Sequence, residues 1–159
     1  MGVSGSGKST VAAALADRLG WPLAEGDDFH SPENVAKMHA GTPLTDADRL
    51  PWLKSIAGWI AGRLDAGEAG VVTCSALKHT YRDLLSGGRP EVEFVYLKGS
   101  PAVMAEHLAG RHGHFMPASL LASQFDALEE PGPDEPVLTV DVDQPVGALV
   151  AQIVCQLEL

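Results

Sequence analysis

Residues 2–9 read Gly-Val-Ser-Gly-Ser-Gly-Lys-Ser and match the pattern G-x-x-x-x-G-K-[ST] at every defined position. The stretch leads directly into a helical pattern over residues 8–19, which Gly20 ends. Glycines allow a tight loop whose backbone N–H groups point inward, and the positive end of the following helix adds to the attraction for anions. A flexible Gly/Ser-rich tail is the alternative, but the complete pattern followed by a helix argues against it. The sequence therefore predicts a phosphate-binding loop.

This loop assigns a role to two side chains. Lys8 is expected to reach the β- and γ-phosphates of a nucleotide, and the Ser9 hydroxyl to ligate Mg²⁺. The nucleotide-binding residues predicted from the motif are Gly2, Val3, Ser4, Gly5, Ser6, Gly7, Lys8, Ser9 and Thr10. ATP and Mg²⁺ are therefore the expected cofactors.

Outward from the loop, short β-rich runs alternate with longer helical stretches. A chain of 159 residues is of ordinary size for one domain, residues 1–159. Strand candidates are residues 21–25, 71–74, 92–97 and 137–142; helix candidates are residues 8–19, 32–39, 46–66, 77–85, 101–111, a stretch ending near 128, and 146–157. Strands that alternate with helices of about ten residues indicate a parallel sheet covered on both faces. The predicted fold class is α/β.

The predicted loop lacks one structural partner in the sequence. A phosphate-binding loop of this kind should follow a central buried strand, and only Met1 precedes Gly2. Leaving that position empty would unpair backbone groups of the neighbouring strands at about 1–3 kcal/mol each. We therefore expect several upstream residues in the natural protein, with Met1 at the end of the first strand.

Charge and composition exclude several classes of protein. The formal net charge is −10, and no Lys or Arg follows Arg111. Such a chain repels duplex DNA and anionic membranes, so neither is an expected partner. No apolar run reaches the ~18–20 residues of a membrane span, and no secretory signal is visible. With only Cys74 and Cys155 there is no disulfide framework, and we expect a soluble, cytoplasmic protein.

Two neighbouring carboxylates are the candidates for a catalytic base. Asp27 and Asp28 follow the predicted strand 21–25, on the carboxyl edge of the sheet where α/β proteins bind ligands. Either could accept a proton from an acceptor hydroxyl, or could serve only in a turn or helix cap. His30 lies just beyond and could bond a polyol or a carboxylate.

Three cations are candidates for binding an anionic acceptor. Arg49 lies in the first turn of a predicted helix, where it either pairs with Asp46 or Asp48 or holds an anionic ligand. Lys78 and Arg82 are four residues apart and share a helical face, which is an anion clamp or a solvated basic face.

A polar segment completes the candidate site. Arg111 precedes a Gly-containing stretch, and a lid at about 111–118 bearing one arginine would suit a transferring phosphoryl group. The alternative is a helix-terminal arginine favoured by the dipole. His112 and His114 lack further ligands at zinc-binding spacing. The absence of an Asn-Lys-x-Asp sequence argues against a GTPase.

The chain resembles gluconokinases of the small P-loop type, which are related in fold to shikimate and adenylate kinases. The resemblance covers nearly the whole chain and rests on GVSGSGKST (2–10), EGDDFH (25–30), NVAKMHAGTPLTDADRLPWL (34–53), CSALKHTYRDLL (74–85), VYLKG (95–99) and GHFM with LLASQFDALEEP (113–131). It implies phosphorylation of D-gluconate by ATP to 6-phospho-D-gluconate, in carbohydrate acid catabolism that feeds the pentose phosphate or Entner-Doudoroff pathway.

The resemblance also implies a three-layer α/β/α fold with strand order 2-3-1-4-5, the first strand truncated at the centre. Asp27 would be the base, preferred to Asp28, and Arg111 the lid arginine. Residues implied for the gluconate pocket are Asp27, His30, Arg49, Ser75, Lys78, Arg82 and His114. The loop at residues 143–145 would pack on adenine, or is an ordinary turn. A homodimer is implied as well.

Two alternatives remain open at this point. One is a kinase for another small polar acid such as shikimate. The other is a regulatory nucleotide-binding module without phosphoryl transfer.

Overall fold

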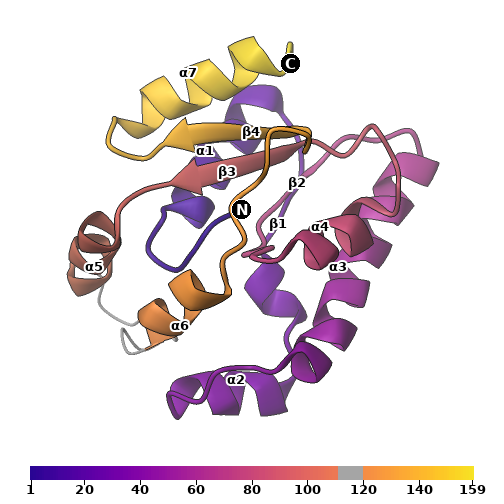
Figure 1. The fold of residues 1–159 in the computed structure, drawn as a ribbon. Helices are drawn as coiled ribbons and strands as arrows, with labels where there is room; N and C mark the ends of the chain where they lie inside the picture. Colours follow the sequence, from indigo (N-terminus) through magenta and orange to yellow (C-terminus); the bar gives the residue numbers. More distant parts are fainter. Residues whose placement is uncertain (111–119) are drawn as a thin grey trace.

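The computed structural model describes residues 1–110 and 120–159, and its elements alternate along the chain (Figure 1). The α-helices are α1 (Lys8–Leu19), α2 (Pro32–His39), α3 (Asp46–Asp65), α4 (His79–Ser86), α5 (Pro101–Ala109), α6 (Leu120–Ala127) and α7 (Val146–Gln156). The strands are β1 (Leu23–Ala24), β2 (Val71–Val72), β3 (Phe94–Lys98) and β4 (Val137–Asp141), and a 3₁₀ turn, η1, spans Gly26–Phe29. The predicted α/β class is confirmed.

The strands form two parallel pairs that the amino-terminal residues connect. β1 pairs with β2, and β3 pairs with β4 over five positions. Between the pairs, the Met1 carbonyl accepts a hydrogen bond from Leu97 N at 3.0 Å, and Gly2 N donates to Ser75 O at 3.1 Å. From one edge to the other the order is β1, β2, residues 1–2, β3 and β4. This is the expected order 2-3-1-4-5, in which the truncated first strand is central and is represented here by residues 1–2.

A largely apolar cavity of about 550 Å³ adjoins this central position. It opens between the two strand pairs, and Val72 of β2 and Phe94 of β3 are among its lining residues. The amino group of Met1 donates to Val95 O at 2.5 Å. Burial, together with the nearby charge of Lys8, lowers the pKa of this amino group to about 5. When the chain begins at Met1, this amine is therefore buried beside the cavity.

Helices cover both faces of the strands. On one face α1 contacts α7, and their buried residues Val11, Leu15 and Ile153 share a core cluster with Val140 of β4. On the other face α3 packs against α4 through a second cluster that includes Ile56. Figure 1 shows α7 beside β4 and the α3–α4 pair beside β1 and β2. This is the predicted three-layer arrangement.

Local sequence signals explain where the helices begin. Thr45 caps α3, because its hydroxyl accepts from Asp48 N while the Asp48 carboxylate accepts from Thr45 N. α4 begins at residue 79, after the predicted start at about residue 77, because Lys78 is extended (φ −103°, ψ 150°) and serves as the N-cap. Within residues 1–110 and 120–159, no helix is long and apolar enough to cross a membrane.

Candidate active site

The loop at residues 2–7 requires its glycines for steric reasons. Gly5 and Gly7 both have φ of 83°, and Gly7 is the N-cap of α1. A Cβ on Gly5 would lie 2.7 Å from the carbonyl oxygen of Met104 in α5. Lys8 Nζ donates to Gly2 O at 3.1 Å and to Val3 O at 2.9 Å, so its ammonium lies against the loop. Backbone and cation are thus arranged around one small concave surface.

That surface opens into a cavity that collects most of the predicted site residues. Predicted residues in its lining are Ser4, Gly5, Gly7, Lys8, Ser9, Asp27, His30, Arg49 and Ser75. They come from the loop, from η1, from the start of α3 and from the segment after β2. Residues distant in sequence therefore meet at one edge of the strands, the carboxyl edge where α/β folds bind ligands.

The close approach of two strands places Asp27. A Cβ on Gly26 would lie 2.0 Å from the carbonyl oxygen of Thr73, so only glycine fits there. The indole Nε1 of Trp52 donates to Gly26 O at 2.6 Å and holds the turn against α3. Asp27 and Asp28 are both exposed, but only Asp27 lines the cavity.

A carboxylate that the sequence reasoning missed lies beside Ser9. The Ser9 hydroxyl donates to Glu25 Oε2 at 3.0 Å, and the Thr73 hydroxyl donates to the same oxygen at 2.7 Å. A hydroxyl next to a carboxylate is the hard oxygen donor set that Mg²⁺ prefers. The signal was present in the sequence, because Glu25 ends the predicted strand at the ligand-binding edge.

His30 is held as a neutral ring. It stacks on Trp52 with ring centroids 4.2 Å apart and planes inclined by 14°. Its Nδ1 lies 3.5 Å from the side-chain amide nitrogen of Asn34, which in turn donates to Asp48 O at 2.9 Å. Burial, and secondarily the positive charge of Arg49, lower the pKa of His30 to about 4. A neutral imidazole with Nδ1 as acceptor presents an Nε2–H donor.

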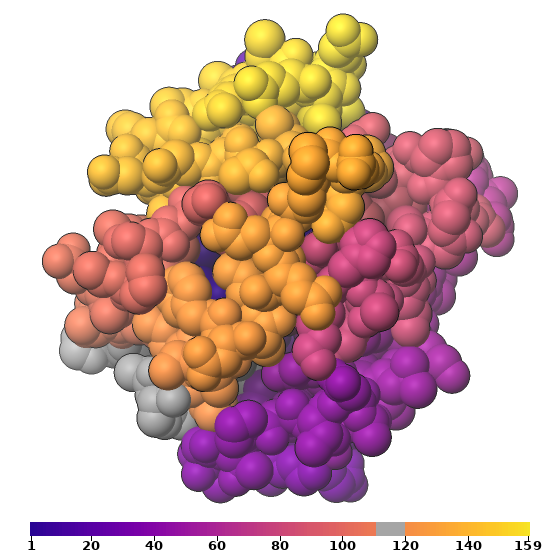
Figure 2. All heavy atoms as spheres, viewed as in Figure 1, coloured from indigo at the N-terminus to yellow at the C-terminus, as the bar shows by residue number. Residues whose placement is uncertain are grey.

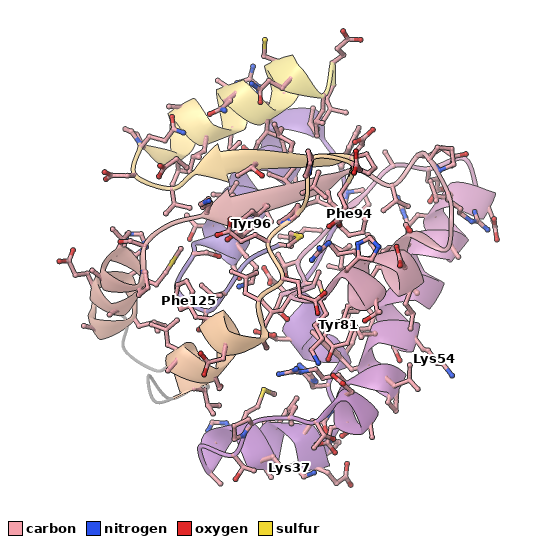
Figure 3. All side chains as sticks on the ribbon, in the orientation of Figure 1. Lys37, Lys54, Tyr81, Phe94, Tyr96 and Phe125 are labelled. Carbon is pink, nitrogen blue, oxygen red and sulfur yellow. The ribbon has the colours of Figure 1, made fainter. Side chains whose placement is uncertain are left out.

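Arg49 does not pair with its acidic neighbours. Asp46 accepts from Tyr81 OH and from Lys78 Nζ, and Asp48 binds Lys37 at 2.8 Å. Arg49 instead donates to Tyr81 OH at 3.4 Å, and Figure 3 labels Tyr81 near α3 and α4. Among the described residues, no carboxylate lies within ion-pair distance of Arg49. Its charge is available to an anionic ligand in the cavity.

Lys78 and Arg82 are not brought to the cavity, in contrast to the expectation. Lys78 Nζ is bound to Asp46 at 2.9 Å. Arg82 is 2% exposed and binds both carboxylate oxygens of Glu135, at 2.7 and 2.8 Å. Arg82 also donates to the carbonyl oxygen of Ala76 at 3.1 Å. The shared helical face suggested a clamp, but the structure gives each cation an acidic partner within the protein.

Other predicted residues fall in different places. Arg111 and His114 lie outside the described residues, as does the predicted lid. Residues 143–145 form the turn between β4 and α7, where Gln144 Nε2 donates to Asp141 O at 2.9 Å. An adenine contact at this turn stays a prediction. Two polar residues that the sequence reasoning missed, Ser123 and Gln124 of α6, line the cavity.

Comparisons with known proteins agree on one family. The chain is 50% identical to the gluconokinase of Gluconobacter oxydans over 154 residues, which are 97% of this chain and 86% of the relative. It is 44% identical to the thermoresistant gluconokinase of Escherichia coli, over 97% of this chain and 89% of the relative. No protein-family model matches the chain.

Solved structures extend the likeness to three dimensions. A crystal structure of a gluconokinase from Sinorhizobium meliloti is 47% identical with a TM-score of 0.84, covering 99% of this chain and 93% of that one. A sugar kinase from Janibacter is 51% identical with a TM-score of 0.94, covering 99% and 91%. The APS kinase of Mycobacterium tuberculosis, 20% identical with a TM-score of 0.69 over 100% and 95%, shares the fold.

Proposed function

The chain belongs to the gluconokinase family, and we propose that it transfers the terminal phosphoryl group of ATP to the 6-hydroxyl of D-gluconate, giving 6-phospho-D-gluconate and ADP. The product would enter carbohydrate acid catabolism. One observation supports the proposal above others: the phosphate loop, Asp27 and Arg49 line a single cavity. A nucleotide phosphate, an acceptor hydroxyl and an acceptor carboxylate thus each have a complementary group within it.

The nucleotide side is built from backbone and one cation. The loop amides and the amino-terminal end of α1 attract the phosphates, and Lys8 neutralises the charge that builds up during transfer. Lys8 must exchange its bonds to the Gly2 and Val3 carbonyls, at least in part, for the phosphate oxygens. The lysine is thus held near its place of action before ATP arrives.

Mg²⁺ fits the donor set at Ser9 and Glu25. When bound, the ion would neutralise phosphate charge and help to orient the terminal phosphate. The Ser9 hydroxyl would be a direct ligand. Glu25 lies where it can accept from that hydroxyl or from a metal-bound water, and Thr73 keeps its carboxylate in place.

The acceptor side divides its work among four residues. Asp27 accepts the proton of the attacking hydroxyl, which raises the nucleophilicity of that oxygen. His30, neutral near pH 7, donates from Nε2 to a hydroxyl of the polyol chain, while Trp52 keeps its ring in orientation. Arg49 binds the carboxylate, and Ser75 offers a further hydroxyl within the cavity.

A coupled assay of ADP release tests the proposal. Gluconate, shikimate, glycerate and nucleoside monophosphates are each offered as acceptor at the same ATP concentration. We expect turnover with gluconate well above all others. Turnover with shikimate alone would identify the other small-acid kinase, and nucleotide binding without turnover of any acceptor would identify a regulatory module.

Three further features remain predictions. A lid at about residues 111–118 would carry Arg111 to the transferring phosphoryl group and His114 to gluconate. A homodimer is expected from the family resemblance, and light scattering at several protein concentrations measures it. A cytoplasmic location is expected from the composition, and cell fractionation measures it.

A further inference from the structure

Two side chains from outside the phosphate loop form hydrogen bonds with its backbone. The carbonyl oxygen of the Gln124 side chain accepts a hydrogen bond from Ser4 N at 2.5 Å. The ring nitrogen Nδ1 of His107 lies 2.9 Å from Gly5 O, to which it donates. Two consecutive loop residues are thus bound, one through its N–H and the next through its carbonyl.

The two contacts come from the helices on either side of residues 111–119. His107 belongs to α5 and Gln124 to α6. Both helices also pack against the loop, since Met104 and Leu108 of α5 and Leu121 of α6 share a core cluster with Val3. Figure 2 shows a small indigo area of the amino-terminal region between the coral atoms of the α5 region and the orange atoms that include α6.

The environment makes the hydrogen bond between Gln124 and Ser4 costly to lose, whereas His107 is exposed. Gln124 is 7% exposed and Ser4 6% exposed, so water cannot easily replace the lost partner. The loop backbone already lies close to α5 at Gly5, because a Cβ added there would lie 2.7 Å from the carbonyl oxygen of Met104. A loop without its partners would relax away from α5 and α6 to regain hydrogen bonds.

We propose that Gln124 and His107 are positioning residues that keep the phosphate loop in its binding-competent conformation. Neither residue need touch the nucleotide for this role. If the loop relaxes, the competent conformation is only a fraction of the population, and the observed nucleotide affinity falls by that fraction. The expected loss of nucleotide affinity does not depend on the acceptor. It can therefore be tested separately from the proposed phosphorylation of gluconate.

Calorimetric titration of the full chain with ADP and with the ATP analogue AMPPNP tests the role. Gln124→Leu removes the acceptor at similar volume and is expected to raise the Kd about tenfold, as the loss of a buried hydrogen bond implies. His107→Leu should act in the same direction. His107→Asn places an amide nitrogen near the position of Nδ1 and should restore the Kd to within about threefold of the parent chain.

A matched control comes from α7. Gln152 accepts a hydrogen bond from Gln144 Nε2 at 3.1 Å and is not part of the cavity lining, so Gln152→Leu makes the same chemical change elsewhere. The Gln124→Leu, His107→Leu double variant should lose less affinity than the product of the single losses, because one relaxed loop costs its affinity only once.

The outcomes separate the possibilities. A raised Kd in both leucine variants, with His107→Asn restored, supports the proposal. Lower melting temperatures with an unchanged Kd would show that the residues serve stability alone and would overturn it. A raised Kd in a chain whose parent form does not phosphorylate gluconate would support the loop-positioning role while contradicting the proposed function.

Discussion

Arg82 and Glu135 form a two-pronged ion pair, with Nε and Nη2 of the guanidinium 2.7 and 2.8 Å from the two carboxylate oxygens. The side chain of Arg82 is 3% exposed and that of Glu135 is 17% exposed. Hydrogen bonds from Arg82 hold the pKa of Glu135 at about 2, below its usual value. Because Arg82 also binds the carbonyl of Ala76, the pair connects the segment before β4 to the turn that carries Ser75.

Removing one member of this pair should destabilise the protein strongly. Arg82→Met leaves Glu135 charged without its main partner, and we expect the free energy of unfolding to fall by about 3–5 kcal/mol. Urea unfolding measures this loss. The double variant Arg82→Met, Glu135→Leu should recover most of the stability, since no charge is then left without a partner. Equal stability of the single variant and the parent would refute the structural role.

The base at η1 can be identified by comparing two neighbours. Asp27→Asn cannot accept the hydroxyl proton, and we expect kcat to fall by roughly 10²–10⁴. Nucleotide affinity should remain, because the loop and Lys8 are unchanged. Asp28→Asn is the matched control and should keep most of the activity, since Asp28 is not part of the cavity lining. A larger loss from Asp28→Asn would reverse the assignment.

Arg49 should bind the carboxylate of the acceptor. Arg49→Met removes a charged hydrogen-bond donor, and we expect the KM for gluconate to rise roughly 10- to 100-fold with little change in the KM for ATP. Lys78→Met serves for comparison. Its effect on the gluconate KM should be smaller, because Asp46 already binds the Lys78 ammonium. Steady-state kinetics measures both, and a larger effect at Lys78 would contradict the geometry.

His30 should remain neutral far below its ordinary pKa. Its pKa of about 4, lowered by burial and by Arg49, predicts a neutral ring throughout pH 5.5–8. NMR titration of the imidazole resonances measures this directly. A plot of the gluconate KM of the parent chain against pH should therefore show no inflection near pH 6.5 that arises from His30. The His30→Asn variant tests the origin of any inflection, because it would abolish one that His30 causes. Finding such an inflection would place a protonated His30 in the site.

In a chain that begins at Met1, the free amino group of Met1 should make stability depend on pH. The Met1 amine has a pKa of about 5 in the folded chain, below its ordinary value of 8.0, because burial disfavours the ammonium. Between those values the unfolded chain binds the extra proton, so the free energy of unfolding should rise with pH, by up to about 1.4 kcal/mol per pH unit. Urea unfolding at pH 5.5, 6.5 and 7.5 measures the slope.

Acetylation of the Met1 amine supplies the control. The acetyl group removes the charge in both states, and the cavity of about 550 Å³ beside Met1 can accommodate it. We expect the acetylated chain to be more stable at pH 6 and to have a smaller slope. His30 contributes a slope of the same sign between about pH 4 and 6.5, which acetylation leaves unchanged. A slope unaffected by acetylation would show that the amine is not buried in solution.

Sequence periodicity predicted most of the fold because its signals are local. α2 occupies the predicted residues 32–39, and α3 spans Asp46–Asp65 where residues 46–66 were predicted. The strands β1 and β2 are shorter than predicted, because only two residues in each strand form pairs with the other. Apolar composition marks a buried segment, but the number of paired residues depends on what lies beside the strand.

The sequence by itself determined the phosphate loop, the α/β class and the strand edge at which Asp27 lies, because each follows from a short pattern or from strand polarity. That His30 and Arg49 join Asp27 there was implied only by the family resemblance. Only the tertiary structure decided that Arg82 binds Glu135, and that Gln124 reaches Ser4 across 120 positions of sequence. Such contacts depend on how separate elements pack, and the identity of a polar residue does not say which of several distant partners will lie within hydrogen-bond distance.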